Sequence, residues 1–316
     1  MEEQRLKITH VNLSREKGTI KQPVNEVVVD GWGIQGDAHA GPWHRQVSLI
    51  DRDSLDRFYH KTGRKVQPGE FAENLTVEGM DPGHVKLLDR FAHKEMILEV
   101  TQIGKKCHGD DCAIFREVGK CAMPEEGIFT RVLRGGFVRP GEALTYQPKT
   151  WKGLVITLSD RAHAGQYPDK SGKKIEEGLR EFMSQHFPSP EVSRHVLPDE
   201  QHQLINALSK ARSAGYDVVF TTGGTGIGSR DIAPETIRVL MDKEIPGIME
   251  MVRMKYGRDN PNALLSRSIA ATMGRTLVYA LPGSSKAVAE YLDVILPTLK
   301  HSIWMVHDLD AHGRNA

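Results

Sequence analysis

The sequence predicts two successive domains: a β-rich barrel or sandwich, then an α/β domain with a mostly parallel sheet. Three observations support this prediction. A chain of 316 residues exceeds one ordinary core. Short apolar runs separated by turn residues fill the first half, and strand-like and helix-like segments alternate in the second. The polar stretch 147–150 precedes a new apolar run, so we expect the domains at residues 1–148 and 152–316.

The first half is typical of many short strands. Runs such as 25–31, 45–51, 73–79 and 94–104 are rich in β-branched residues, and Gly, Pro, Asp and Asn separate them. Only the segment from Asp53 to Lys61 has a helical pattern. Spacing alone does not distinguish a barrel from a sandwich.

The second half predicts a parallel sheet that is covered on both faces. The expected strands are 153–159, 191–197, 217–222 and 276–283, and the expected helices are 173–186, 200–213 and 285–299. Such alternation places ligands at the carboxyl ends of the strands. Residues 248–254 include three methionines at mixed helical spacing, which predicts core packing and not a metal site.

The balance of charge excludes several classes of partner. With 42 basic and 41 acidic side chains the formal charge is +1, so no broad field favours nucleic acid or an anionic membrane. No run approaches the roughly 18 apolar residues of a membrane span. A soluble, cytoplasmic protein is therefore expected. Three cysteines do not describe a disulfide framework, which indicates reduced thiols.

The segment 217–235 is the most informative part of the chain. A buried strand runs directly into Thr222, Gly223, Gly224, Thr225 and Gly226. Glycines let backbone N–H groups converge on an anion, so this turn predicts a phosphate or pterin cradle. Its spacing differs from the dinucleotide fingerprint and from the P-loop, which disfavours a nicotinamide cofactor. The alternative is that the glycines only permit close packing.

Two aspartates follow strands at the same expected edge of the sheet. Asp231 comes after the glycine turn and Asp199 after the strand 191–197. Nucleotidyl transfer needs acidic groups that hold Mg²⁺ against a triphosphate, and both residues suit that task. Taken alone, Asp199 is better explained as a helix cap. The turn 281–285 is a second place for a phosphate, although Ser284 also fits a plain N-cap.

These segments resemble the MogA/MoaB family, whose eukaryotic relatives include the plant Cnx G domain and gephyrin. The resemblance spans residues 152 to about 300. It rests on LSDRAHAGQYPDKSG (158–172), LPDE (197–200), TTGGTGIGSRDIAPE (221–235), EIPGI (244–248), LLSRS (264–268) and LPGS (281–284). It implies a three-layer α/β domain that forms a homotrimer and adenylylates molybdopterin with Mg²⁺ and ATP, releasing pyrophosphate.

The resemblance also implies roles for individual residues. Asp199 and Asp231 match the essential acids of the family, which reverses the interpretation of Asp199 as a cap. The residues implied to line the pterin and nucleotide site are Asp160, Thr222, Gly223, Gly224, Thr225, Gly226, Ser266, Pro282, Gly283 and Ser284.

All three cysteines lie within residues 103–121. The lysines at 105 and 106 favour the thiolate of Cys107, which makes it the best candidate for a nucleophile or a sulfur carrier. A zinc site with His108, Cys112 and Cys121 is an alternative, but the spacing matches no familiar zinc motif. Cys112 and Cys121 also suit small buried residues. The sequence assigns no metal ligand.

The cysteine segment, together with residues 33–51 and 127–144, resembles a MOSC domain over most of residues 5–147. This resemblance implies a β-barrel-like module that binds the molybdenum or tungsten cofactor, or passes sulfur through one cysteine, with Cys107 in the equivalent place. Arg45 is expected to pair a phosphate.

Two hypotheses follow for the whole chain. In the first, the second domain is an adenylyltransferase, and the first receives, sulfurates or delivers the product to metal-insertion and recipient enzymes. In the second, both domains only carry pterin or finished cofactor. The presence of both Asp199 and Asp231 favours the enzyme. The sequence does not choose between molybdenum and tungsten.

Overall fold

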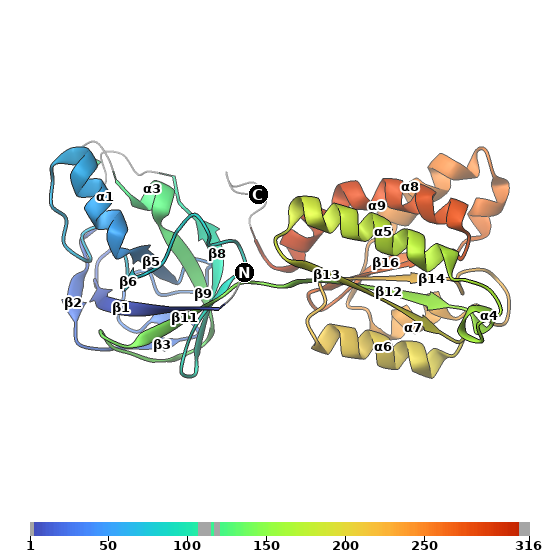
Figure 1. The fold of residues 1–316 in the computed structure, drawn as a ribbon, viewed down its shortest axis with the longest axis horizontal. Helices are drawn as coiled ribbons and strands as arrows, with labels where there is room; N and C mark the ends of the chain where they lie inside the picture. Colours follow the sequence, from blue (N-terminus) through green and yellow to red (C-terminus); the bar gives the residue numbers. More distant parts are fainter. Residues whose placement is uncertain (1–2, 107–114, 117–120, 310–316) are drawn as a thin grey trace. The chain divides into compact units, whose positions relative to one another are not determined.

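The computed structural model describes residues 3–106, 115–116 and 121–309. The chain divides between Lys149 and Thr150 into two compact units, which are described separately below (Figure 1). Cys107 and Cys112 lie outside the described residues. Within those ranges, no helix combines the length and the apolar character that crossing a bilayer requires.

The first unit is a closed β-barrel, which confirms the barrel and excludes the sandwich. In the described part of this unit, the strands that close the barrel are β1 (Gln4–Leu13), β11 (Ala143–Gln147), β7 (Arg90–His93), β8 (Met96–Ile103), β9 (Ile128–Arg134), β5 (Val47–Asp51) and β6 (Leu75–Glu78). Closure follows because β1 pairs with both β11 and β6. The β5–β6 pair is parallel and the other neighbours are antiparallel.

Several short strands and helices accompany the barrel strands in the first unit. β2 (Gln22–Val24) extends β1, while β3 (Val27–Asp30), β4 (Gly33–Ile34) and β10 (Gly136–Val138) form a small sheet. The predicted helix is present as α1 (Arg52–Thr62), and a short α3 (Met123–Glu126) precedes β9. Asp51 caps α1 by accepting a hydrogen bond from the Asp53 N–H, and Gly63 ends the helix with a left-handed φ of 73°.

The second unit has the three layers that the resemblance implies. Its sheet runs in the order β13 (Pro190–Leu197), β12 (Trp151–Leu158), β14 (Val218–Thr222), β17 (Thr276–Leu281), β16 (Ile269–Met273) and β15 (Lys243–Glu244). The first four strands are parallel, and β16 is antiparallel to β17. Figure 1 shows α5 (Lys170–His186), α8 (Pro246–Gly257) and α9 (Ser285–Val306) on one face, and α6 (Gln201–Ser213) and α7 (Ala233–Leu240) on the other.

Alternation along β12 supplies the core on both faces of this sheet. Leu154, Ile156 and Leu158 pack with side chains from α6 and α7 in one apolar cluster. Trp151 begins the strand, stacks on Phe187 at a centroid separation of 4.2 Å, and is 1% exposed. β12 is therefore buried on both faces, as a parallel strand covered by helices on both sides is expected to be.

The structure corrects two details of the sequence prediction. α9 extends past Leu299 to Val306, and β16 was not predicted. The expectation that the methionines of 248–254 fill the core holds for Met249, but Met251 and Met254 are 53% and 64% exposed. The reason is that α8 presents one face to the core, and a run that is apolar all round does not identify that face.

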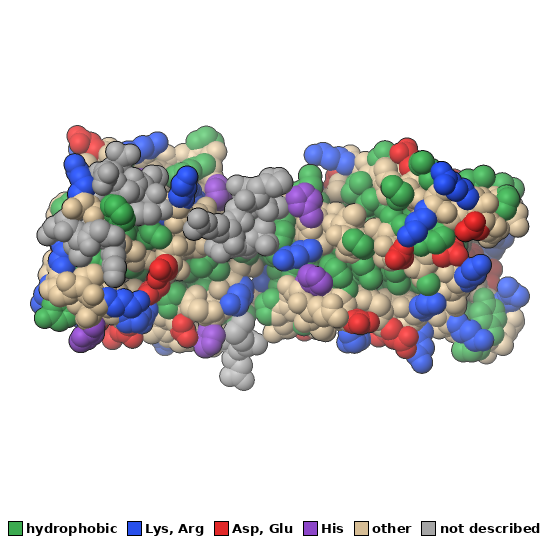
Figure 2. Space-filling view, turned by 90° about the horizontal axis from the view of Figure 1, so that it is seen from above, with side chains coloured by type: hydrophobic (Ala, Val, Ile, Leu, Met, Phe, Trp, Pro, Cys, Tyr) green, Lys and Arg blue, Asp and Glu red, His purple; other side chains and the backbone are tan. Residues whose placement is uncertain are grey.

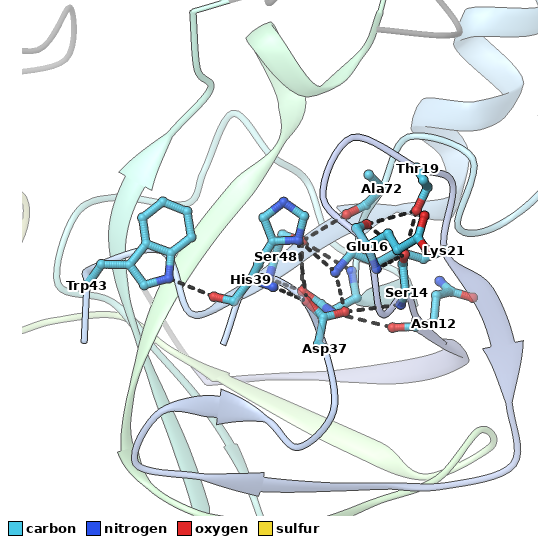
Figure 3. Close-up of polar contacts among 11 residues, drawn as sticks. Asn12, Ser14, Glu16, Thr19, Lys21, Asp37, His39, Trp43, Ser48 and Ala72 are labelled. Carbon is cyan, nitrogen blue, oxygen red and sulfur yellow. Dashed lines mark hydrogen bonds and ion pairs between the residues drawn. The ribbon is translucent and has the colours of Figure 1, made fainter. Parts of the chain in front are cut away.

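A buried polar network in the first unit is centred on Asp37 (Figure 3). Its carboxylate accepts hydrogen bonds from Lys21 Nζ at 2.5 Å, Asn74 Nδ2 at 3.1 Å, the Ser14 N–H at 3.3 Å and the His39 N–H at 2.9 Å. Burial alone would raise the pKa of Asp37, but the contacts with His39 and Lys21 hold it well below its usual range. The network ties the loop after β4 to the barrel.

Glu73 lies beside this network and is fully buried. Its Oε1 accepts hydrogen bonds from the Gly69 N–H at 2.6 Å and from Thr76 Oγ1 at 2.9 Å, while Oε2 has no partner among the described residues. Burial raises the pKa of Glu73 to about 7. The folded barrel therefore favours the protonated acid.

We predict that the stability of the first unit falls between about pH 4.5 and 7, because Glu73 must lose its proton in a buried place as the pH rises. The raised pKa stabilises the fold at low pH, and this contribution, roughly 3 kcal/mol, is lost above pH 7. Glu73→Gln should remove that part of the pH dependence. Hydrogen exchange of β1 and β6 in the intact chain, between pH 4.5 and 8, measures it. The exposed Glu78→Gln is the matched control, and an unchanged pH profile in Glu73→Gln would contradict the assignment.

Candidate functional site

A cavity of about 690 Å³ opens at the carboxyl ends of β12, β14 and β17. The turns that follow these strands, together with the turn after β13, supply most of its wall. Parallel strands bring their carboxyl ends to one edge of the sheet, so segments that are far apart in the sequence meet here. The cavity lies where the sequence predicted a ligand.

The cavity collects many of the predicted site residues. Those that line it are Asp160, Asp199, Thr222, Gly224, Asp231 and Gly283. Gly223, Thr225, Gly226, Ser266, Pro282 and Ser284 are not among the lining residues, although Ser285 is. Both predicted acids therefore face the same cavity.

The glycine turn owes its shape to close approaches of the backbone. Gly223 has a φ of 97°, and a Cβ there would lie 2.3 Å from the carbonyl oxygen of Leu158. Gly224 is also left-handed, with a φ of 62°, and a Cβ on Gly226 would lie 2.8 Å from Asp231 Oδ2. Packing of the turn against β12 and around Asp231 thus requires these glycines. The hydroxyl of Thr222 donates to the Pro282 carbonyl at 2.8 Å, which joins the two predicted anion turns.

Asp160 and Asp199 are joined by reciprocal hydrogen bonds. The Asp160 N–H donates to Asp199 Oδ2 at 3.1 Å, and the Asp199 N–H donates to Asp160 Oδ1 at 3.0 Å. The interpretation of Asp199 as a helix cap is wrong, because Glu200 occupies the N-cap position of α6 and no side chain caps that helix. The carboxylate of Asp199 is instead part of the clamp that holds the turns after β12 and β13 together.

Electrostatics distinguishes the acids of the cavity. Burial raises the pKa of Asp199, and the negative charges of Asp160 and Asp231 raise it further. The pKa of Asp160 is lowered by the Asp199 N–H and by Arg230. Asp231 Oδ2 accepts the Gly228 N–H at 2.8 Å, which orients that carboxylate. Burial first, and neighbouring negative charge second, thus disfavour the ionised form of Asp199.

The donor set suits a magnesium ion that is shared with phosphates. Hard carboxylate oxygens are the ligands that Mg²⁺ prefers, and proteins often supply only one or two of them beside substrate phosphates. Asp199 and Asp231 fit that pattern. Among the residues that the structure describes, no group of three or more His, Cys, Asp or Glu side chains could hold a metal ion by itself.

Ser266 is not brought into the cavity. Its hydroxyl lies 2.7 Å from Ser268 Oγ and accepts a hydrogen bond from the Tyr291 hydroxyl at 3.0 Å. Those contacts hold the segment between η2 (Pro261–Leu265) and β16 against α9. The ligand contact that the resemblance implied for Ser266 stays a prediction; the structure shows its hydrogen bonds with Ser268 and Tyr291.

Three of the lining residues that the sequence analysis did not predict carry charge or an aromatic ring near the acids. Tyr167, in the loop between α4 (Asp160–His163) and α5, shares a hydrogen bond of 2.9 Å with Ser159 Oγ. The guanidinium of Arg161 lies 5.2 Å from the centre of its ring. Arg230 precedes Asp231 and pairs with Asp160. All three stand inside the quoted motifs, so the signal was present, but single cations and aromatic residues are common on surfaces.

In the first unit, the buried network around Asp37 supports a loop with aromatic and basic side chains (Figure 3). Trp43 Nε1 donates to the His39 carbonyl at 2.7 Å. The guanidinium of Arg45 lies 4.8 Å from the centre of the Trp43 ring and 5.8 Å from that of Phe129. Burial lowers the pKa of Arg45. A partly desolvated guanidinium of this kind suits an anionic ligand.

Of the cysteines, only Cys121 is described. It is partly exposed and lines a cavity of about 320 Å³ beside Phe58 and Lys61 of α1. The expectation that Cys121 is a small buried residue is therefore only partly met. The predictions for Cys107 and Cys112 fall outside the described residues.

Comparison with known proteins agrees with both resemblances. Residues 154–301 match the model of a probable molybdopterin binding domain, and residues 36–145 match that of the MOSC domain. The chain is 35% identical over 153 residues to a molybdopterin adenylyltransferase of Helicobacter pylori, covering 48% of this chain and 85% of the relative. It is 39% identical over 159 residues to that of Pyrococcus furiosus, covering 49% and 90%.

Gephyrin of Dictyostelium discoideum is 35% identical over 163 residues, which are 50% of this chain and 23% of gephyrin. The chain thus spans about a quarter of that relative and most of each adenylyltransferase. Its matches to these relatives cover about half of its own length, the same share as the second unit. The chain belongs to the family of molybdenum cofactor biosynthesis proteins that includes the molybdopterin adenylyltransferases, with a MOSC domain in its first half.

Proposed function

We propose that the second unit adenylylates molybdopterin with Mg²⁺ and ATP and releases pyrophosphate. The observation that carries this proposal is that Asp199 and Asp231 face one cavity beside the glycine turn, in a chain whose relatives include molybdopterin adenylyltransferases. A protein that only carried pterin would have little use for two such carboxylates beside a phosphate site. The cavity of about 690 Å³ is within the usual range for a small-molecule site.

In the proposed reaction, an oxygen of the molybdopterin phosphate attacks the α-phosphorus of ATP. A new P–O bond forms as the bond to the bridging oxygen of the β-phosphate breaks, and pyrophosphate leaves. The task of the protein is positioning and charge stabilisation. Gly224, Gly283 and Arg161 line the cavity, and their main-chain N–H groups and the guanidinium would bind phosphate oxygens. Asp199 and Asp231 would hold the magnesium ion, which neutralises phosphate charge.

For the first unit, we propose that it binds, sulfurates or delivers the molybdenum or tungsten cofactor. Arg45, desolvated beside Trp43 and Phe129, is the proposed contact for a phosphate of that ligand. Cys107 is the proposed sulfur carrier, because the lysines at 105 and 106 favour its thiolate. Metal-insertion and recipient enzymes are the proposed partners.

We predict that Asp231→Asn reduces the formation of adenylylated molybdopterin at least about 100-fold, because it removes a charge that the transition state requires. The assay follows pyrophosphate release from purified protein, molybdopterin, ATP and Mg²⁺. Asp259→Asn, an exposed aspartate outside the cavity, is the matched control and should retain activity. Tight pterin binding by the wild type without any pyrophosphate release would favour the carrier hypothesis instead.

We predict that Cys107→Ala abolishes persulfide labelling of the protein and leaves adenylylation unchanged, since the two reactions belong to different units. Cys112→Ala and Cys121→Ala provide matched controls that keep the labelling. Mass spectrometry of the labelled protein identifies the modified thiol. Equal labelling of the wild type and Cys107→Ala would remove Cys107 from the proposal.

We further propose that the second unit forms a homotrimer. Exposed apolar side chains on α8 and η2 support this: Met251, Met254, Leu264 and Leu265 are each more than half exposed. Figure 2 looks onto the layer of α5, α8 and α9 and shows hydrophobic side chains between charged ones on this unit. Neighbouring exposed apolar residues of this kind are typical of interfaces between subunits.

We predict that Met254→Lys combined with Leu264→Lys converts the trimer to a monomer, because lysine is costly to bury at an interface. Light scattering of the intact chain measures the mass. Ile20→Lys, at an exposed site in the first unit, serves as the control and should leave the trimer intact. A trimer that survives the double substitution would place the interface elsewhere.

A further inference from the structure

Arg230 links the loop after β14 to the turn after β12. Its Nη2 pairs with Asp160 Oδ2, while Asp160 Oδ1 accepts the Asp199 N–H at 3.0 Å. Arg230, Asp160 and Asp199 therefore form one chain of contacts that joins the turns after β12, β13 and β14. All three residues line the cavity.

The two arginines of the cavity have different partners. The guanidinium of Arg161 lies over the ring of Tyr167, and no carboxylate among the described residues forms an ion pair with it. The guanidinium of Arg230 is neutralised by Asp160, whose two carboxylate oxygens are both occupied. Of the two arginines, Arg230 is the one whose positive charge is already paired with a carboxylate of the protein.

This pairing is easily exchanged. The side chains of Arg230 and Asp160 are 64% and 49% exposed, and such exposed ion pairs contribute little to stability. A guanidinium pairs at two points with a phosphate as it does with a carboxylate, and a polyphosphate offers it several negative charges where Asp160 offers one. A polyphosphate that enters the cavity therefore competes well for Arg230.

We propose that Arg230 is a phosphate-binding residue whose guanidinium pairs with the carboxylate of Asp160 in the free protein. When a nucleotide binds, its phosphates displace that carboxylate from Arg230. The proposal rests on the proposed adenylyltransferase function for the identity of its ligand. It assigns to Asp160 the role of a competitor, and not that of a direct ligand of the substrate. A purely structural link is the alternative, in which the pair serves only to position Asp199.

The two explanations predict opposite effects of Asp160→Asn on the affinity for an anion. If Asp160 competes with the phosphates, Asp160→Asn frees Arg230 and tightens anion binding, whereas Arg230→Gln weakens it. If the pair is only structural, both substitutions break the link between the loop after β14 and the turn after β12, and both weaken binding. Asparagine keeps an oxygen that can accept the Asp199 N–H, so the clamp itself survives in Asp160→Asn.

The experiment measures the affinity of the intact chain for inorganic pyrophosphate by titration calorimetry in the presence of EDTA. We expect about fivefold tighter binding for Asp160→Asn and about tenfold weaker binding for Arg230→Gln. Arg230→Lys should recover only part of the loss, because ammonium lacks the planar pair of donors. Arg238→Gln, which removes an exposed arginine of α7 that lies near Glu244, is the matched control for the change in charge.

The double variant Asp160→Asn with Arg230→Gln distinguishes competition for Arg230 from a simple change in the electrostatic field of the cavity. The gain from Asp160→Asn should disappear when Arg230 is absent, which a double-mutant cycle reports directly. A gain that persists without Arg230, or weaker binding in Asp160→Asn, would overturn the proposal. The assay needs no turnover. Failure of the wild type to adenylylate molybdopterin, with this coupling intact, would count against the proposed function and not against the exchange at Arg230.

Discussion

The parallel register of β12, β13 and β14 is the constraint on which the second unit depends. It ends three strands at one edge of the sheet, and the turns that follow them are then held by contacts between main chain and carboxylate. Gly223 lies against the carbonyl of Leu158, and the reciprocal hydrogen bonds of Asp160 and Asp199 close the neighbouring turns. Because these contacts involve backbone N–H groups, they fix the direction of each carboxylate before any ligand arrives. Positioning by the scaffold is what a nucleotidyl transfer requires most.

The first unit positions its candidate site by burial. Lys21 and Asp37 are almost completely removed from water, and the network around Asp37 is saturated with donors. A buried ion pair is weak evidence for stability, because desolvation offsets much of the attraction. Its geometric effect is clear, since the network anchors the loop that carries His39 and Trp43 (Figure 3), and Arg45 lies over the Trp43 ring. The two units therefore hold their exposed functional groups by different means: one by the ends of a parallel sheet, the other by a polar core inside a barrel.

Local patterns in the sequence predicted the elements well, and contacts between distant residues poorly. The strand that leads into Gly223, the helix from about residue 200 and the barrel-like first half all follow from periodicity and turn residues. Asp199 was first assigned as a cap because its true partner, Asp160, lies 39 residues away. Met251 was assigned to the core because an apolar helix does not reveal which face is packed. Lys21 was overlooked because nothing in its neighbourhood indicates that a lysine there is buried against Asp37. These failures share one cause: each depends on a partner that only the fold supplies.

The charges in the cavity bear on how a nearly neutral chain would bind the highly charged nucleotide of the proposed reaction. The formal charge of the whole protein is +1, so attraction of a nucleotide must be local. Yet Asp160, Asp169, Asp199 and Asp231 line the cavity against three cations, Arg161, Lys170 and Arg230. Arg194 pairs with Asp169 at 2.6 Å, so the charges at the cavity are nearly balanced, and the raised pKa of Asp199 comes first from its burial. A site of this kind has little net charge with which to attract a polyanion, so binding would draw on a guanidinium released from its carboxylate, or on an accompanying cation. A magnesium ion at Asp199 and Asp231, as proposed, would neutralise part of this charge and strengthen the binding of a nucleotide.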